Sequence, residues 1–131
     1  MVVTTCRYLL DTCIMIDLLR NRKSTLSMVE AYGIENCAVS EITAAELFVG
    51  AEKSIRNNAC HEVEELLTFF DVIPVTNAIR EYARQRAMLE KQGNKIDDFD
   101  LLIGATAVVN DMIMVTDNIK HFERIRGIRL N

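Results

Sequence analysis

The sequence predicts an α/β fold: a single three-layer domain in which helices cover both faces of a parallel sheet. Short apolar runs alternate with longer segments of helical periodicity, the pattern of strands joined by crossover helices. The runs are continuously apolar, as in Ile113–Val115, and strands buried on both faces lack polar alternation. The length of 131 residues fits a single domain over residues 1–131.

The first half of the chain supplies two of the strands and four helices. Strands are expected over residues 7–10 and 37–39. Helices are expected over residues 12–21, 24–33, 41–53 and 55–69. Thr12 and Ser24 are the expected caps of the first two helices, and either Ser40 or Thr43 caps the third, because short hydroxyl side chains accept hydrogen bonds from free backbone N–H groups.

The second half supplies three strands and three helices. Strands are expected over residues 72–75, 112–115 and 125–130, and the lone proline places the first of these at a sheet edge or a strand end. Helices are expected over residues 76–92, 99–110 and 118–123. The first of these helices is expected to turn Ile79, Ala83, Ala87 and Leu89 inward. Asp97 or Asp98 caps the second.

Composition excludes several classes of protein. The net charge of -4, from 15 basic and 19 acidic residues, is unlike that of a protein that coats nucleic acid. No apolar run is long enough to span a bilayer, and residues 1–7 do not resemble a secretory signal, so a cytoplasmic location is expected. The four cysteines form no CxxC pair, which argues against zinc and predicts free thiols.

Four acidic residues from separate segments are expected to meet at one edge of the sheet. Asp11 and Asp117 directly follow apolar strands, and Glu46 and Asp100 lie on helices that start at the same edge. In open parallel sheets, sites form outside the carboxyl ends of the strands. Carboxylate oxygens are the ligands that Mg²⁺ and Mn²⁺ prefer. The set therefore predicts a divalent-metal site suited to phosphodiester hydrolysis.

Each acid also has a structural interpretation when it is taken alone. Asp11 is a plausible turn residue before a helix, and Asp100 benefits from the helix dipole. Glu46 lies among apolar neighbours, which a buried ion pair with an arginine or lysine would explain. Asp97 and Asp98 are further acids whose part in the site is open. The convergence of four acids at one edge favours the functional interpretation over the separate structural ones.

Four stretches of the sequence resemble the PIN-domain ribonucleases, and within them the VapC toxins of type II toxin–antitoxin pairs. They are Leu9–Thr12 before an apolar helix, Ser40–Gly50, Asp100–Ala107, and Val115–Asn118 with the following residues 121–128. Any one stretch is weakly specific, but their order and spacing agree over essentially the whole chain. The resemblance implies a five-stranded parallel sheet and a Mg²⁺- or Mn²⁺-dependent endoribonuclease.

The resemblance also implies roles for particular residues. Asp11, Glu46 and Asp100 take the places of the family's three central acids. Asp117 and Asn118 compete for a fourth acidic place, for which Asp117 is preferred. Supporting roles fall to Thr12 and Thr116, at positions where the family uses a hydroxyl. Gly104 stands where the family usually has alanine, and we expect no effect of this change on the chemistry.

The partners implied by the resemblance are a cognate antitoxin, a structured RNA substrate (transfer RNA or a ribosomal RNA loop) and a second copy of the chain in a homodimer. No membrane partner is expected. Two alternatives stay open. One is another magnesium-dependent nuclease or phosphatase on the same scaffold, which only a panel of substrates would separate. The other is a module that binds RNA or protein and has lost catalysis, against which the complete acidic set argues.

Overall fold

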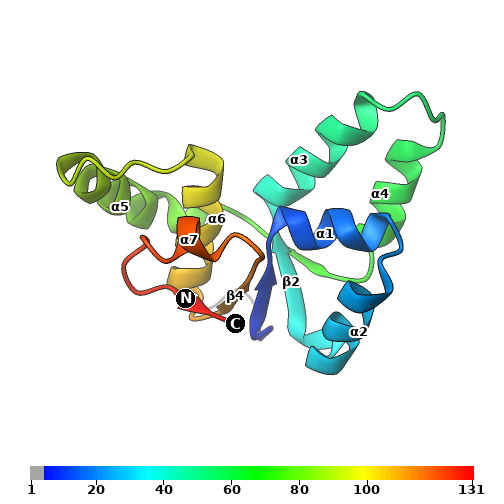
Figure 1. The fold of residues 1–131 in the computed structure, drawn as a ribbon, viewed down its shortest axis with the longest axis horizontal. Coiled ribbons are helices and arrows are strands. Elements are labelled where there is room, and N and C mark those ends of the chain that lie inside the picture. The colour runs from blue at the N-terminus through cyan, green and yellow to red at the C-terminus, as the bar shows by residue number, and fades with distance from the viewer. Residues whose placement is uncertain (1–4) are drawn as a thin grey trace.

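The computed structural model describes residues 5–131, which form a five-stranded parallel sheet between two layers of helices (Figure 1). The strand order is β3-β2-β1-β4-β5, and each neighbouring pair is parallel. The strands are β1 (Tyr8–Leu10), β2 (Cys37–Ser40), β3 (Asp71–Ile73), β4 (Ile113–Val115) and β5 (Arg129–Leu130). The α/β, three-layer fold class expected from the sequence is confirmed.

The helices divide between the two faces of the sheet (Figure 1). One face is covered by α1 (Thr12–Leu19), α2 (Lys23–Tyr32), α3 (Glu41–Glu52) and α4 (Ala59–Leu67). The other is covered by α5 (Ile79–Lys91), α6 (Asp98–Val109) and α7 (Ile119–Phe122). Single 3₁₀ turns lie at Ile34–Asn36 and Thr76–Ala78. None of the helices within residues 5–131 has the length and apolar character needed to cross a membrane.

The central strands are buried on both faces, which explains their continuous apolar runs. Leu9 and Leu10 are each 0% exposed, yet Leu9 packs under α5, α6 and α7 while Leu10 packs under α1 to α4. Met114 and Val115 divide between the two cores in the same way. Successive side chains of a strand point to opposite faces, so one short strand serves two hydrophobic cores.

Several boundaries differ from those expected, each for a local reason. Asp11, and not Thr12, caps α1, because its carboxylate already faces the backbone N–H of Thr12. Strand β3 ends at Ile73, so the proline follows the strand. Strand β5 contains two residues, because Ile125 belongs to the core beside α7 and does not extend the sheet.

The expected inward face of α5 is wrong at three of its four positions. Leu89 is buried, but Ile79 is 51% exposed and Ala83 and Ala87 are also exposed. Gln85 is buried in their place, because its side-chain amide hydrogen-bonds both backbone groups of Arg126. The periodicity of apolar residues cannot identify the buried face of a helix when a polar side chain on that face is buried through hydrogen bonds to the backbone of a distant segment.

The sheet topology predicts a crevice at the carboxyl ends of β1 and β4. From β1 the chain builds outward through β2 to β3, then crosses to the opposite side of β1 to form β4. Strand order therefore reverses between β1 and β4, and such a reversal leaves an open crevice in doubly wound sheets. Asp11 follows β1 and Thr116 follows β4, so both lie at this crevice.

Candidate active site

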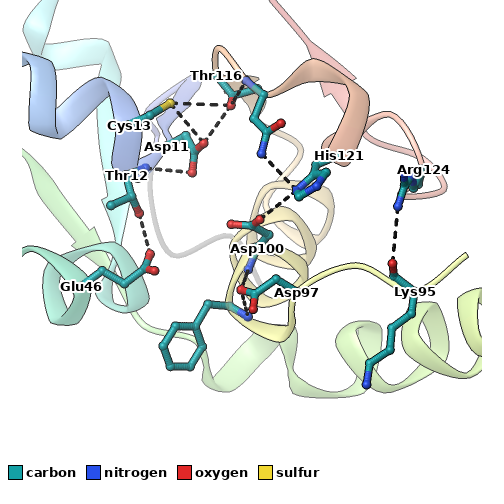
Figure 2. A network of polar contacts seen from close by, with 12 residues as sticks. Asp11, Thr12, Cys13, Glu46, Lys95, Asp97, Asp100, Thr116, His121 and Arg124 are labelled. Carbon is teal, nitrogen blue, oxygen red and sulfur yellow. Dashed lines mark hydrogen bonds and ion pairs between the residues drawn. The ribbon is translucent and has the colours of Figure 1, made fainter.

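Asp11 is held rigidly at the end of β1. It is 5% exposed, and its Oδ1 accepts a hydrogen bond of 2.8 Å from the backbone N–H of Thr12. Its Oδ2 accepts the hydroxyl of Thr116 at 2.8 Å and the thiol of Cys13 at 3.4 Å (Figure 2). Burial, followed by the influence of Asp11, raises the pKa of Cys13 to about 11, so this thiol keeps its proton at neutral pH and donates it.

Glu46 enters the site from α3 and meets α1. The Thr12 hydroxyl donates to Glu46 Oε1 at 2.7 Å, and the same hydroxyl lies 3.0 Å from Thr43 Oγ1. Thr12 therefore contacts two acids, because its backbone N–H holds Asp11 while its side chain holds Glu46. Figure 2 shows the Glu46 carboxylate pointing toward Thr12 from the α3 side.

Asp100 enters from the first turn of α6 and contacts the segment that follows β4. Its Oδ2 lies 3.2 Å from Nδ1 of His121, and that nitrogen also lies 3.0 Å from the side-chain amide nitrogen of Asn118. The backbone N–H of Asn118 donates in turn to Thr116 Oγ1 at 2.9 Å. A chain of contacts thus runs from Asp100 through His121, Asn118 and Thr116 to Asp11 (Figure 2).

The two neighbouring acids of α6 have separate roles. Asp97 is the N-cap, and its Oδ2 accepts hydrogen bonds from the backbone N–H groups of Phe99 and Asp100. Asp98 instead accepts hydrogen bonds from Tyr82 and Arg86 of α5. Asp97 therefore lies beside the site and adds to its negative charge, whereas Asp98 joins two helices.

The electrostatics of the site disfavour negative charge on two of its acids. Burial, with added repulsion from Asp100, Asp11 and Asp97, raises the pKa of Glu46 despite the Thr12 hydrogen bond. Burial is also the main cause that raises the pKa of Asp100, which Asp11 and Asp97 raise further and the contact with His121 lowers. Both groups would be stabilised by a cation placed among them.

No arginine or lysine within residues 5–131 forms an ion pair with Asp11, Glu46 or Asp100. The ion pair with an arginine or lysine that was considered for Glu46 is therefore not formed in this part of the chain. The described residues also hold no group of three histidine, cysteine, aspartate or glutamate side chains already gathered closely enough to ligate a metal. The acids converge on one crevice without forming a closed cage.

The fourth acidic candidate is placed differently from the other three. The side chain of Asp117 is exposed, while Thr116 on one side and Asn118 on the other take part in the contacts that join Asp11 to Asp100. The backbone of Asp117 hydrogen-bonds the Cys13 thiol. Within the described residues, the chain therefore brings Asp11, Glu46, Asp100, Thr12, Thr116 and Asn118 into one network and leaves the Asp117 carboxylate outside it.

Sequence reasoning assigned no role in the site to Cys13, Thr43 or His121. Cys13 was expected only to be one of four free thiols, and Thr43 only a possible helix cap. The closing segment contains His121 within its family resemblance, but a single histidine carries no spacing signal of its own. The sequence did offer one signal for placing Cys13 in the site. Cys13 lies two residues after Asp11, in the first helical turn after β1, and residues there lie at the same edge of the sheet as Asp11.

A sequence model of the PIN domain matches residues 8–128. This match shows that the chain belongs to the PIN domain family, the class that the fold and the acidic crevice define. Within the family its relatives are VapC ribonucleases. It is 33% identical to the tRNA(fMet)-specific endonuclease VapC of Shigella flexneri, over 94% of this chain and 95% of that protein. It is 35% identical to ribonuclease VapC2 of Haemophilus influenzae, with the same coverage.

Solved structures of a VapBC complex and of a toxin–antitoxin complex share the fold. DNA-bound VapBC of Salmonella typhimurium superposes with a TM-score of 0.89 and 29% identity, covering 96% of this chain and 97% of that one. A toxin–antitoxin complex from Klebsiella pneumoniae gives a TM-score of 0.71 and 31% identity, covering 92% and 94%. The resemblance noted in the sequence is confirmed.

Proposed function

We propose that this protein is the toxin of a toxin–antitoxin pair and acts as an endoribonuclease. The observation that carries the proposal is the convergence of Asp11, Glu46 and Asp100 at the carboxyl ends of β1 and β4, without an arginine or lysine partner in the described residues. Relatives that match over 94% of the chain are named ribonucleases. The acids are therefore assigned the catalytic and metal-binding roles.

A divalent cation, Mg²⁺ or Mn²⁺, is proposed to bind Asp11, Glu46 and Asp100. The ligand set fits because it consists of oxygens, and because burial, with added repulsion among the acids, raises the pKa of Glu46 and Asp100. When bound, such a cation stabilises the negative charge that develops on a phosphate during hydrolysis. Asp117 stays a candidate for a further contact, which its exposed side chain would make from the edge of the crevice.

The residues of the chain would share the work of hydrolysis. Asp11 is fixed by three donors and presents a carboxylate whose orientation does not depend on substrate. Glu46 and Asp100 present the other two carboxylates of the site, and either would accept a proton from the attacking water. The oxygen of that water forms a bond to phosphorus, while the bond from phosphorus to one ribose oxygen breaks. The leaving ribose oxygen takes up the proton that the carboxylate accepted, so the two products are an RNA end with a phosphate and an RNA end with a hydroxyl.

Basic side chains around the crevice are proposed to bind the RNA backbone. Arg20 lines the same hollow as Glu46, between α1, α3 and α4, and forms no ion pair within residues 5–131. Figure 2 draws Lys95 and Arg124 beyond His121, where the Arg124 guanidinium donates to the carbonyl of Lys95 at 3.4 Å. Phosphate contacts position the RNA, so Arg20→Ala should weaken binding and reduce its salt dependence without abolishing cleavage.

The proposed substrate is structured RNA, with transfer RNA favoured over a ribosomal RNA loop because the Shigella flexneri relative is named a tRNA(fMet)-specific endonuclease. The proposed partner is an antitoxin protein, since the structural relatives include VapBC and toxin–antitoxin complexes. A homodimer is also proposed. Its formation should make the thermal midpoint rise with protein concentration, which light scattering and melting at several concentrations would measure.

The test incubates the purified protein with total cellular RNA in the presence of magnesium or EDTA, followed by mapping of the cut ends. Wild type, Asp11→Asn and Asp100→Asn are compared with Glu64→Gln, which removes an exposed acid on α4 away from the crevice. We expect discrete cuts that require metal and both acids, and normal cutting by Glu64→Gln. Equal cutting in EDTA would contradict the metal assignment.

The alternatives are separated by adding DNA and small phosphate esters to the same assay. Hydrolysis of these substrates, with RNA left intact, would replace the ribonuclease proposal with another nuclease or a phosphatase. Binding of RNA or protein without cleavage of any substrate, by folded protein supplied with metal, would favour the module that has lost catalysis.

A further inference from the structure

Two threonine hydroxyls and one carboxylate form a line of contacts that joins α3 to α1. Thr43 Oγ1 lies 3.0 Å from Thr12 Oγ1, and the Thr12 hydroxyl lies 2.7 Å from Glu46 Oε1. Thr43 is 0% exposed, whereas Thr12 and Glu46 are half-buried. The line thus begins in the interior of the protein and ends at the acidic crevice.

The direction of the hydrogen bonds in this line follows from counting protons. An ionised carboxylate only accepts hydrogen bonds, so Thr12 must donate its single hydroxyl proton to Glu46. Thr12 then has no proton left for Thr43 and can only accept from it. The Thr43 hydroxyl is therefore the donor in the contact between the two threonines.

The Thr43 hydroxyl has no capping task that would explain its position. Ser40 is the N-cap of α3, and its side chain accepts the backbone N–H of Ile42. Elsewhere in the protein, the buried Thr106 donates back to the carbonyl of Leu102 within its own helix, the usual arrangement for a helical threonine. Thr43 instead contacts a residue 31 positions away on another helix.

We propose that Thr43 is a positioning residue for the acidic site. The Thr43 hydroxyl donates a hydrogen bond to the Thr12 oxygen, so the Thr12 hydroxyl donates its own proton to Glu46. This second hydrogen bond fixes the orientation of the Glu46 carboxylate. The effect extends to Asp11, because the backbone N–H of Thr12 holds Asp11 Oδ1. One buried hydroxyl that never touches substrate thus sets the relative placement of two acids. The inference rests on the proposed function for the role of Glu46, while the hydrogen-bond order itself does not depend on that function.

The test compares substitutions that remove either the hydroxyl or the methyl group of Thr43. Thr43→Val keeps the shape and loses the hydroxyl, Thr43→Ala also loses it without adding bulk, and Thr43→Ser keeps it. We expect Thr43→Val and Thr43→Ala to lower kcat/KM for RNA by about 3- to 10-fold, mainly through kcat, the size expected for one lost hydrogen bond. Thr43→Ser should stay within about twofold of wild type.

A double-mutant cycle with Thr12→Val shows whether Thr43 acts through Thr12. If it does, Thr43→Val has no further effect in the Thr12→Val background. Two readouts need no cleavage: the ¹³C signal of the Glu46 carboxyl in metal-free protein, and the affinity for Mn²⁺ measured by calorimetry. Both should change in Thr43→Val and return toward wild type in Thr43→Ser.

Three results would overturn the inference. The first is an equal loss of kcat/KM in Thr43→Ser and Thr43→Val. The second is a Thr12→Val/Thr43→Val double variant whose loss of kcat/KM is the product of the two single losses. The third is an unchanged ¹³C signal of the Glu46 carboxyl in Thr43→Val. Failure of the wild-type protein to cut any RNA would instead count against the proposed function. In that case the carboxyl signal and Mn²⁺ affinity still decide the role of Thr43.

Discussion

At the scale of single residues, the three central acids have unequal surroundings. Asp11 accepts hydrogen bonds from one backbone N–H, one hydroxyl and one thiol. The carboxylate of Glu46 accepts one from Thr12, and that of Asp100 contacts His121. Three donors thus fix the orientation of Asp11, while burial and neighbouring acids make negative charge costly on Glu46 and Asp100. This division is characteristic of a site built for function at some expense in stability.

The raised pKa of Glu46 leads to a prediction about stability. A carboxyl whose pKa is higher in the folded protein binds protons more readily there than in the unfolded chain, so its penalty is absent at low pH and grows as pH rises through the raised pKa. Glu46→Gln removes this penalty and keeps an acceptor for Thr12. We expect the melting temperature of metal-free Glu46→Gln protein to exceed that of wild type at pH 7.

The advantage of Glu46→Gln should shrink as the pH is lowered toward the ordinary pKa of glutamate, which melting curves from pH 4 to 8 would measure. Glu64→Gln is the matched control, because it removes an exposed glutamate from a neighbouring helix. A lower melting temperature for Glu46→Gln at pH 7 would show that the negative charge of Glu46 stabilises the fold.

At the scale of elements, two helical glycines differ in the space available for a side chain. Gly50 in α3 has open space where a Cβ would lie, so Gly50→Ala should raise the free energy of unfolding by about 0.5–1 kcal/mol through helix propensity alone. At Gly104 in α6, a Cβ would overlap Ile125 and touch Phe122, both in the core. Gly104→Ala should therefore lose this gain and destabilise the protein.

Urea unfolding of the two glycine variants measures the contrast, and each serves as the control for the other. Equal stabilisation by both substitutions would show that Ile125 repacks without cost. The sequence comparison treated glycine for alanine at position 104 as neutral for the chemistry, and the structure adds a packing reason for the small residue there.

The contact of α5 with the chain after α7 yields a further prediction. Gln85 is 5% exposed, and its amide donates to the carbonyl of Arg126 at 2.8 Å and accepts the N–H of the same residue at 3.0 Å. Gln85→Met keeps a long, unbranched side chain but leaves these backbone groups without a partner. We expect a loss of about 1–3 kcal/mol in the free energy of unfolding, measured by chemical denaturation.

The exposed residue at the end of α5 provides the control for that measurement. Gln92→Ala should change the free energy of unfolding by less than about 0.5 kcal/mol. Similar values for Gln85→Met and Gln92→Ala would mean that the Arg126 backbone finds water in place of Gln85.

At the scale of the whole molecule, the two hydrophobic cores are expected to unfold together. Adjacent residues of one strand, Leu9 and Leu10, belong to different cores, so neither core can open without disturbing β1. Calorimetry should give one transition in which the calorimetric and van't Hoff enthalpies agree. The enthalpy should be about 90 kcal/mol near 60 °C for 131 residues. Two resolved transitions would contradict the single domain predicted from the sequence.

The sequence by itself determined the class of fold, the places of most helices and strands, and the candidacy of Asp11, Glu46 and Asp100. These features depend on local periodicity and on the rule that parallel strands end at a common edge, and both can be read along the chain. The end of β1 before Asp11 was accessible for the same reason.

Only the tertiary structure decided which of two adjacent acids caps α6, which face of α5 is buried, and which partner the Thr43 hydroxyl meets. Asp97 and Asp98 are equivalent in a linear pattern, and their roles separate only when Tyr82 and Arg86 approach one of them. Gln85 is buried because a backbone segment 41 residues away satisfies its amide. Such contacts join residues remote in sequence, and hydrogen-bond direction depends on distances that local periodicity does not contain.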